Sequence, residues 1–376
     1  MVRTHNLFAI DLLNKTVEIQ SDNIILAPYS TSTALAMAYL GARGETQLEI
    51  SKVFGWPLDP KEVSQGMREL RAILSAANTI EGIDLNATSG IWVDDSLNPK
   101  QDFIQQSKKL YDVSPQSVDF QKSPHTSRQT INQWVEQMTN ARITDLIPPG
   151  NLDSLTRLLL VTATHYKGVW ARPFKKQETQ ESQFWHSSTH SINIPLMTQQ
   201  HRFPYADTED IQILELPYVE NRLSMIFLLP KKRENLTELE NPFENPKLEK
   251  WLESLKPRFV KASIPRFQMS FGFDLSQTLS MMGMPLAFDQ QADFSGMSDA
   301  VDLHLAAVFH QSFIEVNEEG TEAAGSTGVV MEGRSLQTSP PVVFRADHPF
   351  FFLIRENQSG LIVFLGKVSN PTASPS

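Results

Sequence analysis

The chain has 376 residues, of which 33 are basic and 43 acidic, giving a formal net charge of −10. Apolar residues at 40% and charged residues at 20% are typical of a folded globular protein and exclude general disorder. The acidic balance argues against nucleic acid as the main partner, because phosphate binding needs a surplus of Lys and Arg. No apolar run approaches the length of a transmembrane helix, so we predict no membrane span.

The sequence has no cysteine, which excludes a disulfide, a thiolate nucleophile and a Cys-ligated metal. Residues 1–6 have no apolar signal-peptide core, so either the protein is cytosolic or a signal has been removed. Four Asn-X-Ser/Thr triplets hint at a secretory route, although such triplets also arise by chance. These candidate glycosylation acceptors are Asn14, Asn86, Asn235 and Asn357.

In chain order, apolar residues at helical spacing predict a first helix through residues 7–17 and then a short strand at 23–26. Further helices are predicted over residues 34–41, 67–74 and 131–147. From about residue 157 the pattern changes to strands, and the last two are apolar enough to be buried on both faces. This order predicts an α+β fold with largely antiparallel sheets. The predicted strands are 158–161, 211–216, 224–229, 260–264, 313–316, 342–345, 350–354 and 361–365.

One predicted loop is unusually long. About 25 residues, 317–341, separate two predicted strands, whereas loops beyond about 12–15 residues are usually functional or disordered. Residues 320–328 contain no large side chain, which in isolation is typical of a flexible linker. However, every second residue from Thr321 to Met331 is small or apolar, and Glu322 and Glu332 both fall in the intervening set. This period of two predicts a loop that can also serve as a half-buried strand.

Enzyme motifs are absent. The sequence has no Gly-x-Ser-x-Gly elbow, no His-Glu-x-x-His and no dinucleotide fingerprint. His186 and His190 have the spacing of metal ligands on a helix, but without a third ligand we interpret them as part of a surface loop. Residues 360–367 only superficially resemble a phosphate loop and are interpreted as a strand. We therefore expect no enzyme activity, no metal and no cofactor.

Residues 318–324, Glu-Glu-Gly-Thr-Glu-Ala-Ala, strongly resemble the hinge of the serpin family, the conformational serine protease inhibitors. The resemblance extends over about residues 6–371, which implies a single serpin domain over residues 1–376. The other matching segments are 131–136 with Thr139 and 143–147 (a helix over the main sheet), 166–170 with Phe174, 214–218, 264–267, 292–297, 344–350, 364–368 and 370–371.

The resemblance implies an α+β fold with three β-sheets, about nine helices and an exposed reactive-centre loop at about 317–341. In inhibitory serpins the scissile bond follows the seventeenth residue counted from the first hinge glutamate. Counting from Glu318 gives Arg334, so the reactive bond would be Arg334–Ser335. Arg334 is also the only basic residue between Asn317 and Pro341.

The family mechanism implies that a protease attacks Arg334 and forms an acyl-enzyme through its own serine. The segment from Thr321 onward would then insert into the main sheet, and about fourteen residues would carry the protease on the order of 45 Å. A large or charged residue facing inward would slow this insertion and leave a substrate instead of an inhibitor. The implied hinge comprises Glu318, Glu319, Gly320, Thr321, Glu322, Ala323, Ala324 and Gly325.

The region where the family's main sheet opens usually carries a polar cluster. Ser30 and His310 keep two of its positions, whereas Ala27 stands where a Ser is usual and Thr162 where an Asn is usual. The hydrogen bonds that control opening must therefore differ, which would make the protein either unusually stable or unusually prone to latency.

The residues beside the reactive bond indicate its target. Arg334 requires an acidic primary pocket, which predicts a trypsin-like serine protease. Gly333 fits the narrow secondary pocket of coagulation-type proteases, while trypsin, plasmin-like and activator proteases remain open. The other residues that would set specificity are Met331, Glu332 and Leu336.

The basic residues at 68, 71, 108–109 and 231–233 form only short clusters, so glycosaminoglycan binding is not expected. A monomer is expected, either secreted or at the cell surface, with the cytoplasm as the alternative. The competing function is that of a non-inhibitory serpin acting as a carrier, storage protein or chaperone. It is disfavoured because no bulky or charged residue faces inward in the hinge.

Overall fold

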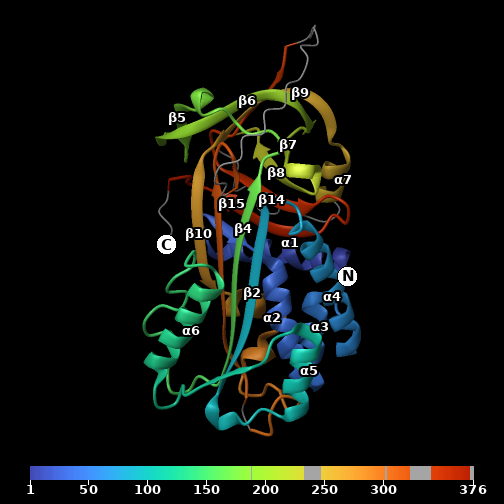
Figure 1. The fold of residues 1–376 in the computed structure, drawn as a ribbon, viewed down its shortest axis with the longest axis vertical. Coiled ribbons are helices and arrows are strands. Elements are labelled where there is room, and N and C mark those ends of the chain that lie inside the picture. The colour runs from blue at the N-terminus through green and yellow to red at the C-terminus, as the bar shows by residue number, and fades with distance from the viewer. Residues whose placement is uncertain (188, 233–246, 301–302, 322–339, 373–376) are drawn as a thin grey trace.

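The computed structural model describes residues 1–187, 189–232, 247–300, 303–321 and 340–372. These residues contain eight α-helices and fifteen strands, arranged as an elongated molecule with most helices beside the lower half of a long sheet (Figure 1). The helices are α1 (Val2–Ile19), α2 (Pro28–Gly41), α3 (Gly44–Phe54), α4 (Pro60–Ala77), α5 (Gln101–Tyr111), α6 (Pro124–Met138), α7 (Lys247–Glu253) and α8 (Ser276–Met282).

The six-stranded main sheet has the order β10-β11-β12-β4-β2-β3. Most of its neighbours are antiparallel, but β4 and β11 run parallel, as do β2 and β3. The strands are β2 (Ile83–Asp94), β3 (Gln116–Val118), β4 (Leu158–Val169), β10 (Phe267–Asp274), β11 (Leu305–Val316) and β12 (Gly320–Thr321).

The second sheet has nine strands, eight of them in the order β1-β15-β14-β8-β7-β6-β9-β13 and the ninth, β5, paired to β6. Three sheets were expected, but the described strands form two, because β6 pairs with both β9 and β7 and so joins two parts of the sheet. The strands are β1 (Ile24–Leu26), β5 (Gln180–Trp185), β6 (Ser191–Asp207), β7 (Ile211–Pro217), β8 (Leu223–Pro230), β9 (Lys256–Pro265), β13 (Val342–Arg345), β14 (Phe350–Glu356) and β15 (Ile362–Val368).

The predicted α+β class is confirmed, and β14 and β15 are almost entirely buried, as their unbroken apolarity indicated. The helix predicted over 131–147 is wrong in its bounds, because α6 ends at Met138. There the Thr139 hydroxyl bonds the Val135 carbonyl and accepts the Ile143 N–H. Asn140 and Ala141 then take positive φ angles, which a helix does not allow.

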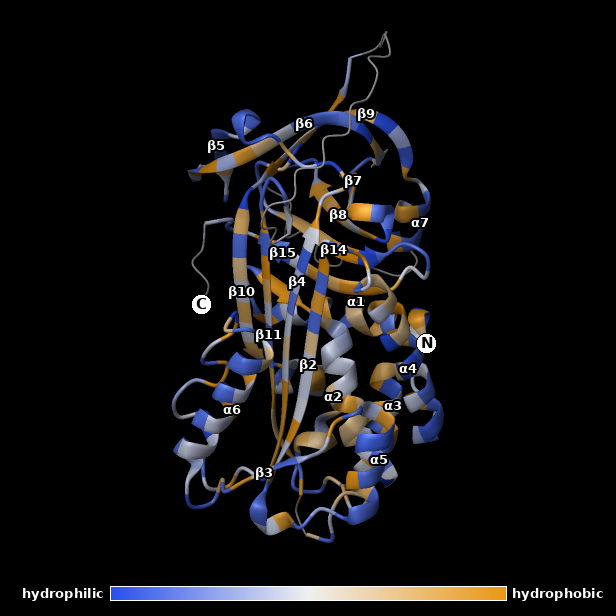
Figure 2. Cartoon of the chain, in the orientation of Figure 1, coloured by the Kyte–Doolittle hydropathy of each residue, from blue (hydrophilic) through white to orange (hydrophobic). Residues whose placement is uncertain are grey.

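The main sheet separates two hydrophobic cores. Alternate residues of β4, such as Leu158 and Leu160, face the large core that also contains α2. The intervening residues, such as Leu159 and Val161, face a smaller core under α6. Hydrophobic segments alternate with white and hydrophilic ones along β2, β4 and β10, whereas α5 and α6 are largely hydrophilic on the side in view (Figure 2). In the described part of the chain, no helix is both long and apolar enough to cross a membrane.

Candidate functional site

The parallel strands β4 and β11 pair directly along the middle of the main sheet. Their register runs from Leu158 opposite Leu305 to Tyr166 opposite Ile314. Beyond Tyr166 and Ile314, the two residues of β12 lie between β4 and β11 and pair antiparallel with both strands. We call the line along which β4 and β11 face each other the β4–β11 boundary, and its end at β12 the upper end. The β4–β11 boundary is therefore closed along most of its length and already holds an intervening strand at its upper end.

Gly320 and Thr321 fit this upper end closely. A Cβ atom on Gly320 would lie 2.0 Å from the Gly168 carbonyl oxygen, so the position accepts only glycine without a backbone shift. The Thr321 side chain is fully buried, and its hydroxyl lies 2.7 Å from the Tyr218 hydroxyl. The second hinge position predicted to face inward from this end, Ala323, lies outside the described residues.

An aromatic stack supports Thr321. The rings of Trp170 and Tyr218 are parallel with centroids 4.5 Å apart, and Tyr166 meets Tyr218 edge-on. Burial raises the pKa of Tyr218, so its hydroxyl keeps its proton and can bond Thr321. Trp170 and Tyr218 occur in segments that resemble the family, but sequence reasoning gave neither a role in holding the hinge.

The two hinge glutamates are anchored to the chain between β4 and β5. Glu318 is nearly buried and accepts a hydrogen bond of 2.7 Å from the Thr179 hydroxyl. Glu319 pairs with Lys176 at 3.0 Å. The Asn317 side chain accepts the N–H groups of Glu319 and Gly320, which shapes the turn before β12. The start of the predicted hinge is thus held in place before the chain enters β12.

The rest of the predicted loop site lies outside the described residues. This applies to Glu322, Ala323, Ala324 and Gly325 of the hinge, to the reactive bond Arg334–Ser335, to Met331, Glu332, Gly333 and Leu336, and to the acceptor Asn235. Their roles remain predictions.

Of the predicted sheet-opening residues, Thr162 contacts His310, and so does Ala27, which stands where the family usually has a Ser. The His310 imidazole is fully buried, with Nδ1 2.8 Å from the Thr162 hydroxyl and Nε2 accepting the Ala27 N–H at 3.3 Å. The Ser312 hydroxyl lies 2.9 Å from Nε2, and the Thr31 hydroxyl 3.4 Å from Nδ1. Sequence reasoning did not identify Thr31 or Ser312, which supply hydroxyl groups around the imidazole where Ala27 has none.

These contacts fix the tautomer of His310. Because Nε2 accepts an N–H, the proton resides on Nδ1 and is donated to the Thr162 hydroxyl. Thr162 can then donate to the Phe309 carbonyl at 3.3 Å. Both contacts cross the β4–β11 boundary. Burial lowers the pKa of His310 to about 3, so the ring is neutral near pH 7.

Ser30 connects this cluster to the neighbouring strands. Its hydroxyl donates to the Ala27 carbonyl at 3.0 Å and accepts from Thr164 at 2.9 Å. Its carbonyl accepts the Ser89 hydroxyl of β2. Ser30 therefore braces α2 against β2 and β4 but does not itself contact His310.

Helix α6 covers the part of the boundary next to Thr162 and His310. Ile131 and Val135 pack in one cluster with Val161 of β4 and Phe309 of β11. The Asn132 amide bonds the carbonyl and N–H of Ile147, which fixes the segment after the helix. A strand inserted between β4 and β11 would have to displace this packing.

Two of the described glycosylation acceptors already use their amide nitrogens. Asn86 Nδ2 donates to the Met138 carbonyl, and Asn357 Nδ2 donates to the Asn221 carbonyl at 2.7 Å and to Ser224. A glycan on either nitrogen would compete with these bonds. Asn14 lies half-buried on α1. The acceptor assignments remain predictions.

His186 and His190 lie on the turn between β5 and β6, with His190 exposed and its Nδ1 2.9 Å from the Thr189 hydroxyl. Among the described residues there is no group of three His, Asp or Glu side chains able to hold a metal.

Comparison with known proteins identifies this architecture. Residues 3–371 match the family described as Serpin (serine protease inhibitor), so the chain belongs to the serpin family. It is 36% identical to the leukocyte elastase inhibitor of Bos taurus and 36% identical to Serpin B3 of Homo sapiens, each over 97% of both chains. Human thyroxine-binding globulin complexed with thyroxine has a TM-score of 0.89, with 30% identity over 99% of both chains.

Proposed function

We propose that this serpin is an irreversible suicide-substrate inhibitor of trypsin-like serine proteases, acting as one domain over residues 1–376. The observation that carries the proposal is β12, which places a buried Thr321 between β4 and β11 at the end where an inserting strand would begin. The protease would be acylated after Arg334, and insertion of the segment from Thr321 onward would trap it. Relatives named as protease inhibitors support the coarser role.

The finer specificity rests on Arg334 as the residue before the reactive bond. Its guanidinium would pair with the acidic primary pocket of a trypsin-like protease. Gly333 would suit a narrow secondary pocket, as in coagulation-type proteases, and trypsin, plasmin-like and activator proteases are also candidates. We propose an extracellular or cell-surface site of action first and a cytoplasmic one second.

The test is to mix the protein with sub-stoichiometric trypsin and separate the products on a denaturing gel. We expect a covalent band near the summed masses and, by mass spectrometry, a released peptide that starts at Ser335. The variant Arg334→Ala is the matched control, because it removes the side chain that trypsin recognises and leaves the hinge unchanged. It should give neither the band nor that peptide.

Complete cleavage after Arg334 without a covalent band would favour the alternative, a non-inhibitory serpin. A carrier role has one structural observation in its favour. A cavity of about 570 Å³ lies between α1, α7 and the turn after β14, where two arginines and two glutamates accompany apolar side chains, namely Arg3, Arg355, Glu249 and Glu253. Thyroxine-binding globulin shows that a protein of this fold can carry a small molecule. The absence of a covalent complex with trypsin, together with binding of a small molecule in this cavity, would establish the carrier role.

A further inference from the structure

Strand β2 leaves part of its outer edge unpaired among the described residues. At one end, the Asn78 side chain bonds both the N–H and the carbonyl of Leu85. At the other end, β3 pairs only with Trp92 to Asp94. Proteins usually protect exposed sheet edges, and here the protection stops between these two points.

The backbone groups that face outward in this gap follow from the ladder. Leu85 points its N–H and carbonyl outward to Asn78, whereas the carbonyl of Gly82 accepts the Val169 N–H across the sheet. In an antiparallel pair these directions alternate along the strand. Ala87 and Ser89 therefore present their N–H and carbonyl groups to the open edge.

The gap exists because β3 begins late. Helix α5 ends at Tyr111, and Asp112 turns the chain with a φ of 62°. Pro115 then precedes β3, and a proline has no N–H for a ladder. The chain before Gln116 consequently passes beside the groove instead of filling it.

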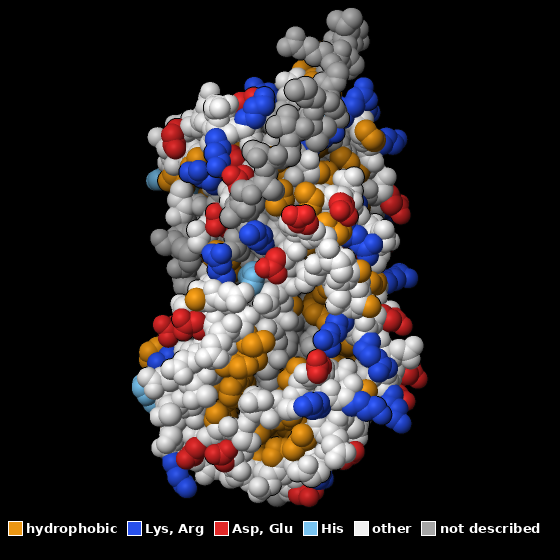
Figure 3. Space-filling view, viewed as in Figure 1, with side chains coloured by type: hydrophobic (Ala, Val, Ile, Leu, Met, Phe, Trp, Pro, Cys, Tyr) orange, Lys and Arg blue, Asp and Glu red, His pale blue; other side chains and the backbone are white. Residues whose placement is uncertain are grey.

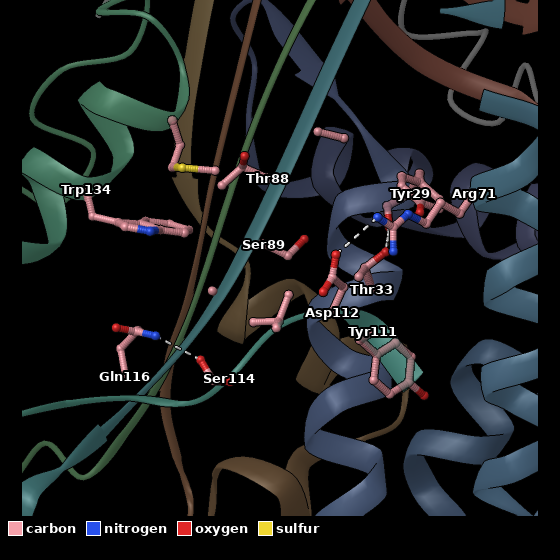
Figure 4. A pocket seen from close by; sticks show the side chains of 14 residues that line it. Tyr29, Thr33, Arg71, Thr88, Ser89, Tyr111, Asp112, Ser114, Gln116 and Trp134 are labelled. Carbon is pink, nitrogen blue, oxygen red and sulfur yellow. Dashed lines mark hydrogen bonds and ion pairs between the residues drawn. The ribbon is translucent and has the colours of Figure 1, made fainter. Parts of the chain in front are cut away.

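A groove of about 390 Å³ follows this open edge, with residues 87–90 of β2 along its floor (Figure 4). Trp134 and Met138 of α6 form one wall, and the opposite wall contains Tyr29 and the Arg71–Asp112 pair, whose charged atoms are 3.5 Å apart. The space-filling view shows apolar side chains gathered around this hollow between α6 and α5 (Figure 3).

A buried donor lies next to the floor. The indole Nε1 of Trp92 is buried and has no hydrogen-bond partner among the described residues. It would lie 3.0 Å from a Cβ on Gly90, while the Trp134 ring would lie 2.9 Å from the same point. Gly90 thus brings the backbone of the groove floor close to both indoles.

We propose that this groove binds an extended peptide segment of a partner protein, which adds a short strand to the free edge of β2. A new strand would lie about 4.8 Å from β2 and bond Ala87 and Ser89. Its side chains would alternate between the two walls. One set faces Trp134 and Met138 and should be apolar, and the other faces Tyr29, Arg71 and Asp112 and should be polar.

The test uses a display library of random eight-residue peptides, selected on the whole protein in the absence of protease. We expect enriched peptides with alternating apolar and polar residues. Methylating the backbone nitrogens of one enriched peptide, one at a time, should weaken binding at least about tenfold at alternate positions only, because just those N–H groups face β2. Weakening at no position, or at every position, would contradict strand addition.

Two variants locate the site. Ala87→Pro removes one outward N–H but no bond to β4, so the sheet should form while the enriched peptide binds at least about tenfold more weakly. Val343→Ala, which trims an exposed apolar side chain on β13, is the control and should bind normally. Equal binding by all three proteins would overturn the proposal. Because no protease is present, this result is independent of whether the protein traps proteases.

Discussion

The upper end and the middle of the β4–β11 boundary differ in how they are closed. At the upper end, Gly320 and Thr321 already separate the two strands and fit without a large side chain. In the middle, the strands pair directly, Thr162 and His310 bond across the boundary, and α6 covers it. If the loop inserts as proposed, the start of insertion needs little rearrangement, and the main resistance lies at His310 and α6.

The largest expected effect is at the upper end. Thr321→Arg would bury a charged group beside Tyr218, and an unpaired buried charge costs several kcal/mol. If this cost raises the activation free energy of insertion, the acyl-enzyme is hydrolysed before the loop inserts. The ratio of trapped to cleaved protein with trypsin should then fall roughly 100-fold. Quantifying the two bands on a denaturing gel measures this ratio.

Thr321→Ser is the matched control for this experiment, because it keeps the hydroxyl that lies 2.7 Å from Tyr218. It should trap trypsin nearly as well as the unchanged protein. Undiminished trapping by Thr321→Arg would mean that inhibition does not need a small buried side chain at this position between β4 and β11.

A smaller effect is expected in the middle of the boundary. Thr162→Val removes the hydroxyl that contacts Nδ1 of His310 and the Phe309 carbonyl, and it leaves the buried Nδ1–H only the longer contact with the Thr31 hydroxyl, at a cost of about 1–3 kcal/mol. The thermal midpoint should fall by a few degrees. Inhibitory capacity should also be lost faster on warm incubation, because the closed sheet would open more readily.

Thr164→Val provides the comparison within the same strand. Its hydroxyl bonds Ser30 and not the facing strand β11, so this variant should also lower the thermal midpoint without accelerating the loss of inhibitory capacity. Equal loss rates in the two variants would show that Thr162 does not restrain opening. If Thr162→Val lost inhibitory capacity no faster than the unchanged protein, the alternative interpretation would be favoured, in which this cluster makes the protein unusually stable.

Sequence reasoning predicted the hinge from a short motif and the sheet-opening residues from the family resemblance. It predicted small inward side chains from the period of two, and Thr321 is indeed buried. It could not predict the bond from Thr321 to Tyr218, because that contact joins residues about a hundred positions apart and depends on the packing of two sheets. Thr31 and Ser312 were missed for the same reason, since their roles depend on where the His310 ring points.

The extent of the strands was also hard to predict. Strand β2 has half-buried polar and small residues in its middle and therefore lacks the apolar run that identified β14 and β15. Its free edge follows from the late start of β3, which is a property of the tertiary structure and not of a motif.

The smallest expected effect is a dependence on pH. Burial lowers the pKa of His310 to about 3 and that of His5 to about 4, below the usual 6.5. The unfolded chain binds these protons below pH 6.5 while the folded protein does not, so stability is lost as the pH falls. Between pH 7 and pH 5.5 each histidine should cost about 1 kcal/mol.

This dependence distinguishes His310 from the other histidines. His310→Gln should reduce the shift of the thermal midpoint between pH 7 and pH 5.5, because only His5 of this buried pair would then remain. His190→Gln, at an exposed position on the turn after β5, should leave the shift unchanged. If the thermal midpoints of both variants shifted with pH as that of the unchanged protein does, protonation of His310 would not limit stability. The resistance to opening of the sheet would then lie in the packing of α6 over Val161 and Phe309.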